Sequence, residues 1–255
     1  MPTGERVLHR QPYAHPPIVE AVINIQVRYP AGRVESLLLA GETAFAPDFA
    51  RKQQLQVLNF NISADQAGSV SGGAPAQNLL GSKFSNDANN RIFQLRQEGF
   101  AYSHLEPYTT WEDLRGDAEP LWRRFRDVCQ PERVTRLAAK YVNRLKLGPG
   151  AIPLGEYLNF YPESPDSFGP IQAFVSQVQL PQPMVGTKAL ALVTVASEQN
   201  SDPRVTSLVL DIDVFEEVDL APDDPQIWQK LERMRDAKNE IFEAALTTTM
   251  KEKFK

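Results

Sequence analysis

The chain has 255 residues, of which 42% are hydrophobic and 23% are charged, a composition typical of one large globular domain. Its net charge of -5 argues against a general polyanion binder, because nonspecific affinity for nucleic acid depends on many Lys and Arg contacts. The single cysteine, Cys129, excludes an intramolecular disulfide and a zinc site built from several cysteines, and it fits a reducing compartment.

The N-terminal region carries no recognisable targeting signal. Residues 1–15 are polar, and we expect a mobile arm that ends at Pro16-Pro17. No run of 18 apolar residues occurs, so we expect neither a membrane-spanning helix nor a membrane partner. These features predict a cytoplasmic protein.

Hydrophobic periodicity in the first 80 residues predicts two strands and one helix. Residues 18–29 alternate apolar and polar side chains, which indicates a half-buried strand. The apolar positions within 33–46 fit an amphipathic helix, and residues 54–62 fit a second strand. The segment 63–78 is rich in Ser, Gly and Ala, so we expect a flexible loop that packs little.

The next part of the chain predicts an antiparallel meander followed by a helix. Turn residues separate three strand-like segments, which are 79–85, 91–98 and 100–106. Thr110 to Asp113 resembles a capping box, with Asp in place of the usual Glu. Apolar residues at spacings of three and four then continue to Cys129, which is typical of an amphipathic helix. Because Pro120 lies inside this pattern, we expect it to kink the helix or split it in two.

The same order of elements starts again in the second half. The predicted elements are a long strand over 133–147, a short helix over 153–160, strands over 173–180, 188–196 and 205–216, and a long helix over 224–254. Each half, 16–130 and 131–255, therefore reads as a β-α-β(3–4)-α unit within a single domain. We predict an α+β fold with one antiparallel sheet covered by helices on one face, as in TATA-binding-protein-like or helix-grip saddles.

Six segments of the sequence carry a family resemblance. They are PPIVEAV at 16–22, GSKFSND at 81–87, GFAYSHLEPYTTWE at 99–112, YVNRL at 141–145, LDIDVF at 210–215 and KNEIFEAALT at 238–247. Together and in this order they resemble a sporadically distributed bacterial family of uncharacterised proteins of about this length. The family's patchy occurrence is similar to that of mobile accessory genes, such as defence or toxin–antitoxin modules. The resemblance implies an accessory role, and it implies no activity and no site residues.

The polar face of the predicted sheet is the first candidate site. Five cations on alternating strand positions would form a partner-binding surface there, namely Arg28, Arg96, Arg136, Lys140 and Arg144. A sheet with helices on one side leaves the other side open to such a partner. The alternative is a solvated face, on which cross-strand ion pairs contribute about 0.2–1 kcal/mol each.

Few residues suggest chemistry. Asp211 and Asp213 place two carboxylates on one strand face, where they are candidate Mg²⁺ ligands, although we favour their pairing with the strand cations. His104 lies near a strand end without a nucleophile motif nearby, and Cys129 occupies an apolar helix stripe that indicates the core. We therefore expect no catalytic residue and no cofactor.

Asn143 stands out on the long strand, because its neighbours on the same face are Tyr141 and Leu145. A buried Asn needs hydrogen-bond partners. Two interpretations remain open, since Asn143 either satisfies a loop or bulge or is a polar group inside a ligand cavity.

Three functions follow from these observations. The leading hypothesis is a non-enzymatic binding or regulatory protein that engages a macromolecular partner, such as a protein encoded nearby, with nucleic acid or a second copy of the chain as further partners. The second is a small-molecule or nucleotide sensor with a cavity between the sheet and the C-terminal helix. The third is a metal-dependent nucleotide enzyme that uses Asp211 and Asp213.

Overall fold

The computed structural model describes residues 13–59, 62–64, 70–72, 76–148, 153–165, 167, 169, 171–198 and 206–255. The strands are β1 (Ile18–Arg28), β2 (Arg51–Asn59), β3 (Ile62–Ala64), β4 (Val70–Gly72), β5 (Ala76–Ser85), β6 (Arg91–Arg96), β7 (Gly99–Leu105), β8 (Arg133–Gly148), β9 (Val175–Pro181), β10 (Leu190–Glu198) and β11 (Thr206–Leu220). The helices are α1 (Val34–Phe45), α2 (Trp111–Cys129), α3 (Gln226–Ala245) and α4 (Thr248–Glu252), with short 3-10 helices η1 (Ala46–Asp48) and η2 (Leu154–Glu156).

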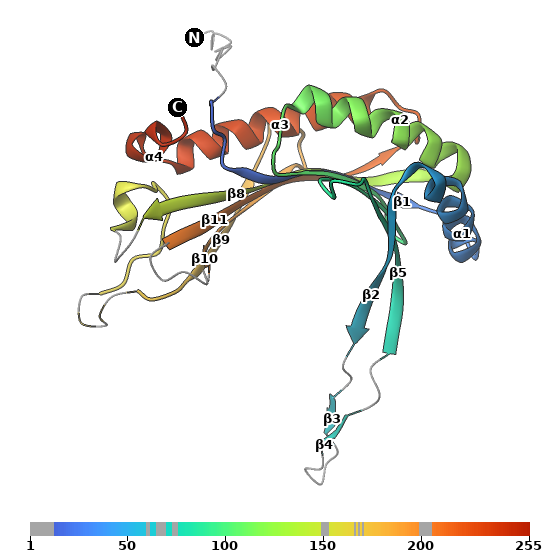
Figure 1. Ribbon diagram of the computed structural model, residues 1–255, viewed down its shortest axis with the longest axis horizontal. Helices are drawn as coiled ribbons and strands as arrows, with labels where there is room; N and C mark the ends of the chain where they lie inside the picture. The colour runs from blue at the N-terminus through green and yellow to red at the C-terminus, as the bar shows by residue number, and fades with distance from the viewer. Residues whose placement is uncertain are drawn as a thin grey trace.

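Nine of the strands form one antiparallel sheet, in the order β2-β5-β6-β7-β1-β8-β11-β10-β9. The sheet is curved, and the helices lie along its convex face while the concave face stays open (Figure 1). This arrangement confirms the predicted α+β class and the covering of one face by helices. We call the uncovered side the open face.

The strand order repeats itself about the centre of the sheet, where β1 pairs with β8 in antiparallel register. In each half the first strand lies beside the last, since β1 pairs with β7 and β8 pairs with β11. A helix follows each of these last strands, namely α2 after β7 and α3 after β11. The topology therefore agrees with a duplicated unit, although the division of the chain at residue 130 stays a prediction.

Strict alternation along the central strands explains why one face is buried. Ile23 and Ile25 of β1 and Leu137 and Ala139 of β8 have no exposed surface, and they face one another across the register. α2 packs on β1 and β7, and α3 packs on β8 and β11. Burial of such apolar surface contributes about 25 cal/mol per Å², so this layer fixes the position of both helices.

In two segments that we expected to be mobile, the structure describes strands or backbone contacts, and their mobility stays a prediction. Strand β4 and parts of β3 and β5 lie within 63–78, where we expected a flexible loop. β3 pairs with β4, and β2 pairs with β5 in a long hairpin that projects from the rest of the sheet (Figure 1). The rest of that range lies outside the described residues. At the N-terminus the described residues begin at Tyr13, and the His15 amide donates to the Phe254 carbonyl oxygen at 2.9 Å. Residues 1–12 also lie outside the described part.

Pro120 does not split α2, which runs unbroken from Trp111 to Cys129. The predicted capping residue is confirmed, since Thr110 Oγ1 accepts from the Asp113 amide at 3.0 Å. Pro120 and Gly116, whose carbonyl loses its intrahelical donor, are both exposed. The unpaired carbonyl therefore faces solvent and the helix can continue.

The predicted C-terminal helix over 224–254 is wrong in one respect, because the chain breaks it into α3 and α4. Leu246 is extended and forms a bridge with Leu158, while the Thr247 amide donates to the Tyr157 carbonyl oxygen at 3.1 Å. Thr247 then caps α4 by accepting from the Met250 amide. η2 is shorter than the helix that we expected over 153–160. The residues that follow η2 form strand-like backbone contacts with Leu246 and Thr247, and these contacts separate α3 from α4.

Candidate functional site

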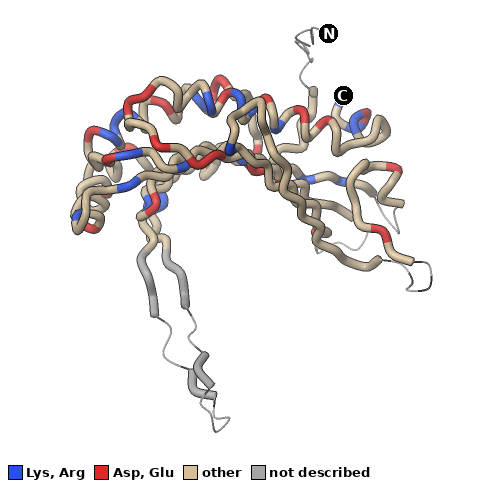
Figure 2. The backbone as a smooth tube through the Cα atoms, turned by 180° about the vertical axis from the view of Figure 1, so that it is seen from behind, with Lys and Arg blue, Asp and Glu red and all other residues tan. Residues whose placement is uncertain are grey.

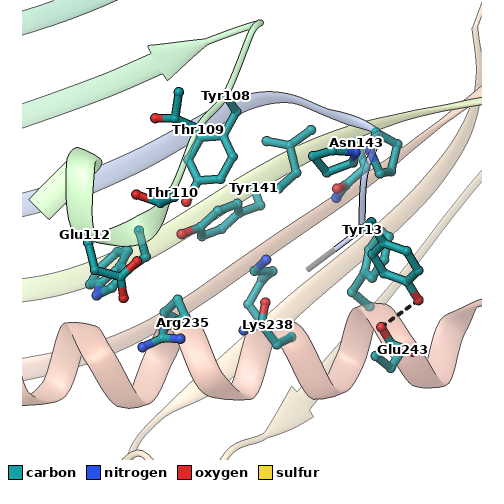
Figure 3. Close-up of a pocket in the computed structure, with 16 residues that line it drawn as sticks. Tyr13, Tyr108, Thr109, Thr110, Glu112, Tyr141, Asn143, Arg235, Lys238 and Glu243 are labelled. Atoms are coloured by element: carbon teal, nitrogen blue, oxygen red, sulfur yellow. Dashed lines mark hydrogen bonds between the residues drawn. The ribbon is translucent and has the colours of Figure 1, made fainter. Parts of the chain in front are cut away.

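A cavity of about 440 Å³ lies between the sheet and α3, where the two halves of the chain meet. The first half contributes the entry to β1 at Tyr13 to Ile18 and the connection from β7 into α2 at Tyr108 to Glu112. The second half contributes Tyr141 and Asn143 of β8 and one face of α3 (Figure 3). Its size falls within the range of small-molecule pockets, about 300–1,000 Å³.

Lys238 of α3 is the most unusual residue of this cavity. Its side chain is only 5% exposed, and its Nζ lies 3.8 Å from the centroid of the Tyr141 ring. Within the described part of the chain, no carboxylate forms an ion pair with it. Burial, assisted by the nearby positive charge of Arg235, lowers the pKa of Lys238 to about 7. Near neutral pH, therefore, a large fraction of this amine carries no charge.

Three polar atoms of residues that line the cavity are buried without a hydrogen-bond partner of good geometry among the described residues. They are the Trp111 Nε1, the Tyr141 hydroxyl and the Asn143 Oδ1. Asn143 is satisfied on its other side, because its Nδ2 donates to the Leu210 carbonyl oxygen at 3.0 Å. All three belong to residues that line the cavity, and unpaired buried polar atoms are costly, so a polar ligand that reached them would be stabilised.

Aromatic rings form the wall of the cavity next to Lys238. The rings of Tyr108 and Tyr141 meet edge to face, with centroids 5.9 Å apart. Burial raises the pKa of Tyr108 to about 12 and that of Tyr141 well above its ordinary value. Both hydroxyls therefore remain protonated at neutral pH. The interaction of the Tyr141 hydroxyl with Tyr108 also raises the pKa of Tyr141, so a ligand that accepts from Tyr141 would compete with Tyr108.

Charged groups line the mouth of the cavity. The guanidinium of Arg235 lies 5.9 Å from the Trp111 ring centroid, and Glu112 is exposed at the start of α2. At the other end Glu243 accepts a hydrogen bond from the Tyr13 hydroxyl at 2.8 Å and pairs with Lys251 (Figure 3). The deep end of the cavity is therefore aromatic and amine-lined, and its rim has charges of both signs.

The five predicted partner-binding cations all lie in ion pairs. Arg28 pairs with Glu132, Arg96 with Glu98, Arg136 with Asp213, Lys140 with Asp211 and Arg144 with Glu198. Acidic and basic residues are accordingly intermixed along the molecule (Figure 2). The structure brings Arg136, Lys140 and Arg144 together on the open face. Arg136 and Lys140 pair with acids from the neighbouring strand β11, and Arg144 pairs with Glu198 at the end of β10.

The arrangement around Asp211 and Asp213 matches the pairing that we favoured. Lys140 Nζ lies 2.8 Å from Asp211 Oδ2, and an Arg136 nitrogen lies 3.1 Å from Asp213 Oδ2. Burial raises the pKa of Asp213 above its ordinary value. No group of three or more His, Cys, Asp or Glu that could hold a metal occurs among the residues described.

The other two chemical candidates lie in the core on the helix side. Cys129 is fully buried, and burial raises the pKa of its thiol to about 12. His104 is also fully buried, with its Nε2 2.9 Å from Asp117 Oδ2 of α2. Burial and the nearby Arg91 lower the pKa of His104, so a neutral ring joins β7 to α2.

Sequence reasoning found Asn143 but missed Lys238. The apolar stripe of α3 runs through Leu231, Met234 and Phe242. Lys238 occupies the position of this stripe between Met234 and Phe242. A lysine on the buried side of an amphipathic helix was therefore the available signal. That it meets Tyr141 could not be inferred, because this contact depends on how α3 crosses β8.

No protein-family model matches the chain, and no curated protein or solved structure matches it either. In the described residues, no helix is both long and apolar enough to cross a membrane. The resemblance to a sporadic bacterial family stays a prediction. The cavity is the structural feature that bears most directly on function.

Proposed function

We propose that the protein binds a small molecule in the cavity between β8 and α3 and acts as a sensor or carrier of that ligand. The observation that carries the proposal is the buried amine of Lys238, which has no carboxylate partner among the described residues and lines a cavity. A protein interior does not usually keep such a group without a compensating contact. A bound ligand would supply that contact.

The lining of the cavity defines the chemistry of its ligand. Lys238, Trp111 and Tyr141 offer donors, which suit a carbonyl, carboxylate or other oxygen acceptor. Asn143 Oδ1 offers an acceptor, which suits an N–H or O–H group. The rings of Tyr108 and Tyr141 favour a planar body. A compact planar compound with one oxygen-rich end therefore fits best, and a nucleobase belongs to this class.

Ligand binding can be tested with the purified protein and a defined panel of nucleotides and planar carboxylic acids. We expect at least one compound to raise Tm, because a ligand that binds only the folded state stabilises it. Native mass spectrometry of protein isolated from cells would show whether a small molecule co-purifies. The variant Asn143→Leu should weaken binding about 5- to 100-fold, the equivalent of one lost buried hydrogen bond.

The matched control is Lys188→Met, which removes a lysine from an exposed position outside the cavity. This variant should bind like the wild type. The proposal is contradicted if Asn143→Leu folds and binds the panel unchanged. It is also contradicted if the protein carries no small molecule from cells and binds none of the compounds.

A macromolecular partner on the open face is the second candidate function. It is favoured by the open face, which no helix among the described residues covers, and by the projecting hairpin of β2 and β5 (Figure 1). The ion pairs argue against a macromolecular partner, since a partner that binds Arg136 or Lys140 must compete with Asp213 or Asp211. A nearby-encoded protein, a regulatory role and a link to defence modules remain proposals of this kind.

A further inference from the structure

Lys238 differs from an ordinary ligand-binding lysine in its surroundings. The amine is 5% exposed, faces an aromatic ring at 3.8 Å and has Arg235 one turn earlier on the same helix. Desolvation and a neighbouring cation are the two conditions that activate lysine as a nucleophile. The cavity beside the amine leaves room for a second reactant.

We propose that the Lys238 amine captures a carbonyl compound in this cavity and holds it covalently as an imine. The inference rests on the proposed ligand-binding function and names the ligand class as a planar aldehyde or ketone. It adds a covalent bond that simple binding of a small molecule does not need.

The reaction balances without an oxidant or a reductant. The lone pair of the neutral amine attacks the carbonyl carbon, and the electron pair of the C=O π bond moves to oxygen. A proton passes from nitrogen to that oxygen, which gives a carbinolamine. The nitrogen lone pair then forms the C=N bond as the hydroxyl group takes up a proton from solvent and leaves as water. The iminium nitrogen returns its remaining proton to solvent, which gives the imine.

The groups around Lys238 suit this step. The Tyr141 hydroxyl keeps its proton at neutral pH, and a carbonyl or carbinolamine oxygen that approached it would compete with Tyr108 for that proton. The titratable and charged groups that face the cavity are Tyr13 before β1, Tyr108 and Glu112 at the start of α2, Tyr141 on β8, and Arg235 and Glu243 on α3. Glu243 is engaged by Tyr13 and Lys251. Arg235 therefore acts on the amine most directly, and it favours the neutral form.

The neutral fraction of the amine gives the size of the expected effect. A pKa of about 7 leaves roughly half of Lys238 neutral at pH 7, while a lysine of ordinary pKa near 10.4 is neutral in less than about 0.1% of molecules. A less basic amine is also less nucleophilic, and the cavity restricts access. We therefore expect a selectivity of at least about tenfold over an exposed lysine.

The experiment uses 4-carboxybenzaldehyde as the probe and cyanoborohydride to reduce any imine, at pH 7. Peptide mass spectrometry then measures how fast each lysine gains the corresponding benzyl group. We expect Lys238 to be labelled at least about tenfold faster than the exposed Lys188. In urea-unfolded protein the two rates should become similar, which would show that the fold causes the selectivity. Lys238→Met should lose only the label at this position.

The outcomes separate the imine from the proposed function. Labelling of Lys238 no faster than Lys188 in the folded protein would overturn the imine. The matched compound 4-(hydroxymethyl)benzoate has no carbonyl group and tests binding alone. If it binds to the cavity while Lys238 stays unlabelled, ligand binding survives and the covalent step fails. If neither compound nor any member of the nucleotide and acid panel binds, both proposals fail.

Discussion

Burial of the Lys238 amine beside the cavity lowers the stability of the folded protein. Transfer of an unpaired ammonium from water into the protein interior is unfavourable, and its pKa falls because the neutral form is easier to bury. The Tyr141 ring offsets part of this cost through a cation–π contact at 3.8 Å. Burial is the larger cause of the lowered pKa, and the positive charge of Arg235 is the second.

We expect Lys238→Met to stabilise the folded protein, by roughly 2 kcal/mol or more at pH 7, because it removes a buried unpaired amine at similar volume. Between the folded pKa near 7 and the unfolded pKa near 10.5, the unfolded chain binds the extra proton. Wild-type stability therefore rises with pH in this window. The advantage of the variant should shrink by on the order of 1 kcal/mol per pH unit.

The measurement is urea unfolding of wild type and Lys238→Met at pH 7 and pH 9. Taking the difference between the two proteins cancels the other titrating groups that they share. A variant that is less stable at pH 7, or a difference that does not change with pH, would contradict the buried-amine interpretation.

At the scale of elements, α2 shows that a proline on the exposed side of a helix need not break it. Pro120 removes one intrahelical hydrogen bond, yet α2 continues because Pro120 and Gly116 are exposed and Trp122 and Phe125 are buried on the opposite side. Packing of the apolar stripe therefore outweighs the local helix propensity.

The variant Pro120→Ala should raise the free energy of unfolding by about 1–2 kcal/mol. The gain comes from the restored hydrogen bond, which is worth up to about 3 kcal/mol, less about 0.4–1 kcal/mol for a more flexible unfolded chain. Denaturant unfolding measures it directly. Asp127→Ala, at another exposed position of α2, is the control and should stay within about 0.5 kcal/mol. An unchanged or less stable Pro120→Ala protein would show that the local backbone requires proline.

Across the whole molecule, the open face is held by charge pairing between strands. Arg136, Lys140 and Arg144 of β8 meet acids from β11 and from the end of β10. Hydrogen bonds to the Glu198 carboxylate lower its pKa below the ordinary value. Arg144 makes the larger contribution and Ser207 the second. Reversing all three cations would place like charges side by side, so a loss of binding would be confounded by a loss of fold.

A charge exchange within one pair avoids this problem. We expect Lys140→Asp alone to lower stability by about 1 kcal/mol and the double variant Lys140→Asp, Asp211→Lys to regain most of it. A double-mutant cycle measured by urea unfolding gives the coupling energy. If a macromolecular partner binds through Lys140 and Asp211, the folded double variant will no longer retain that partner in a pull-down from cells. A cycle without coupling would contradict a structural role for the pair.

The sequence by itself determined the class of the fold and most of its elements. Alternation over 18–29 and 133–147 gave both central strands, and the meander and α2 followed from turn residues and apolar spacing. These signals are local, because each strand or helix must bury one face wherever it lies. The five cations and the two strand aspartates were also visible, as a polar face with charges of both signs.

Only the tertiary structure decided which charges pair, where the C-terminal helix breaks and what surrounds Lys238. The break at Leu246 depends on strand-like contacts with residues near 158, and the cavity depends on the meeting of β8, α3 and the β7–α2 connection. The sequence indicated Asn143 as a cavity candidate, but Lys238, which lines the same cavity, lies 95 positions further along the chain. Contacts of this kind follow from how layers pack, and hydrophobic periodicity carries no information about them.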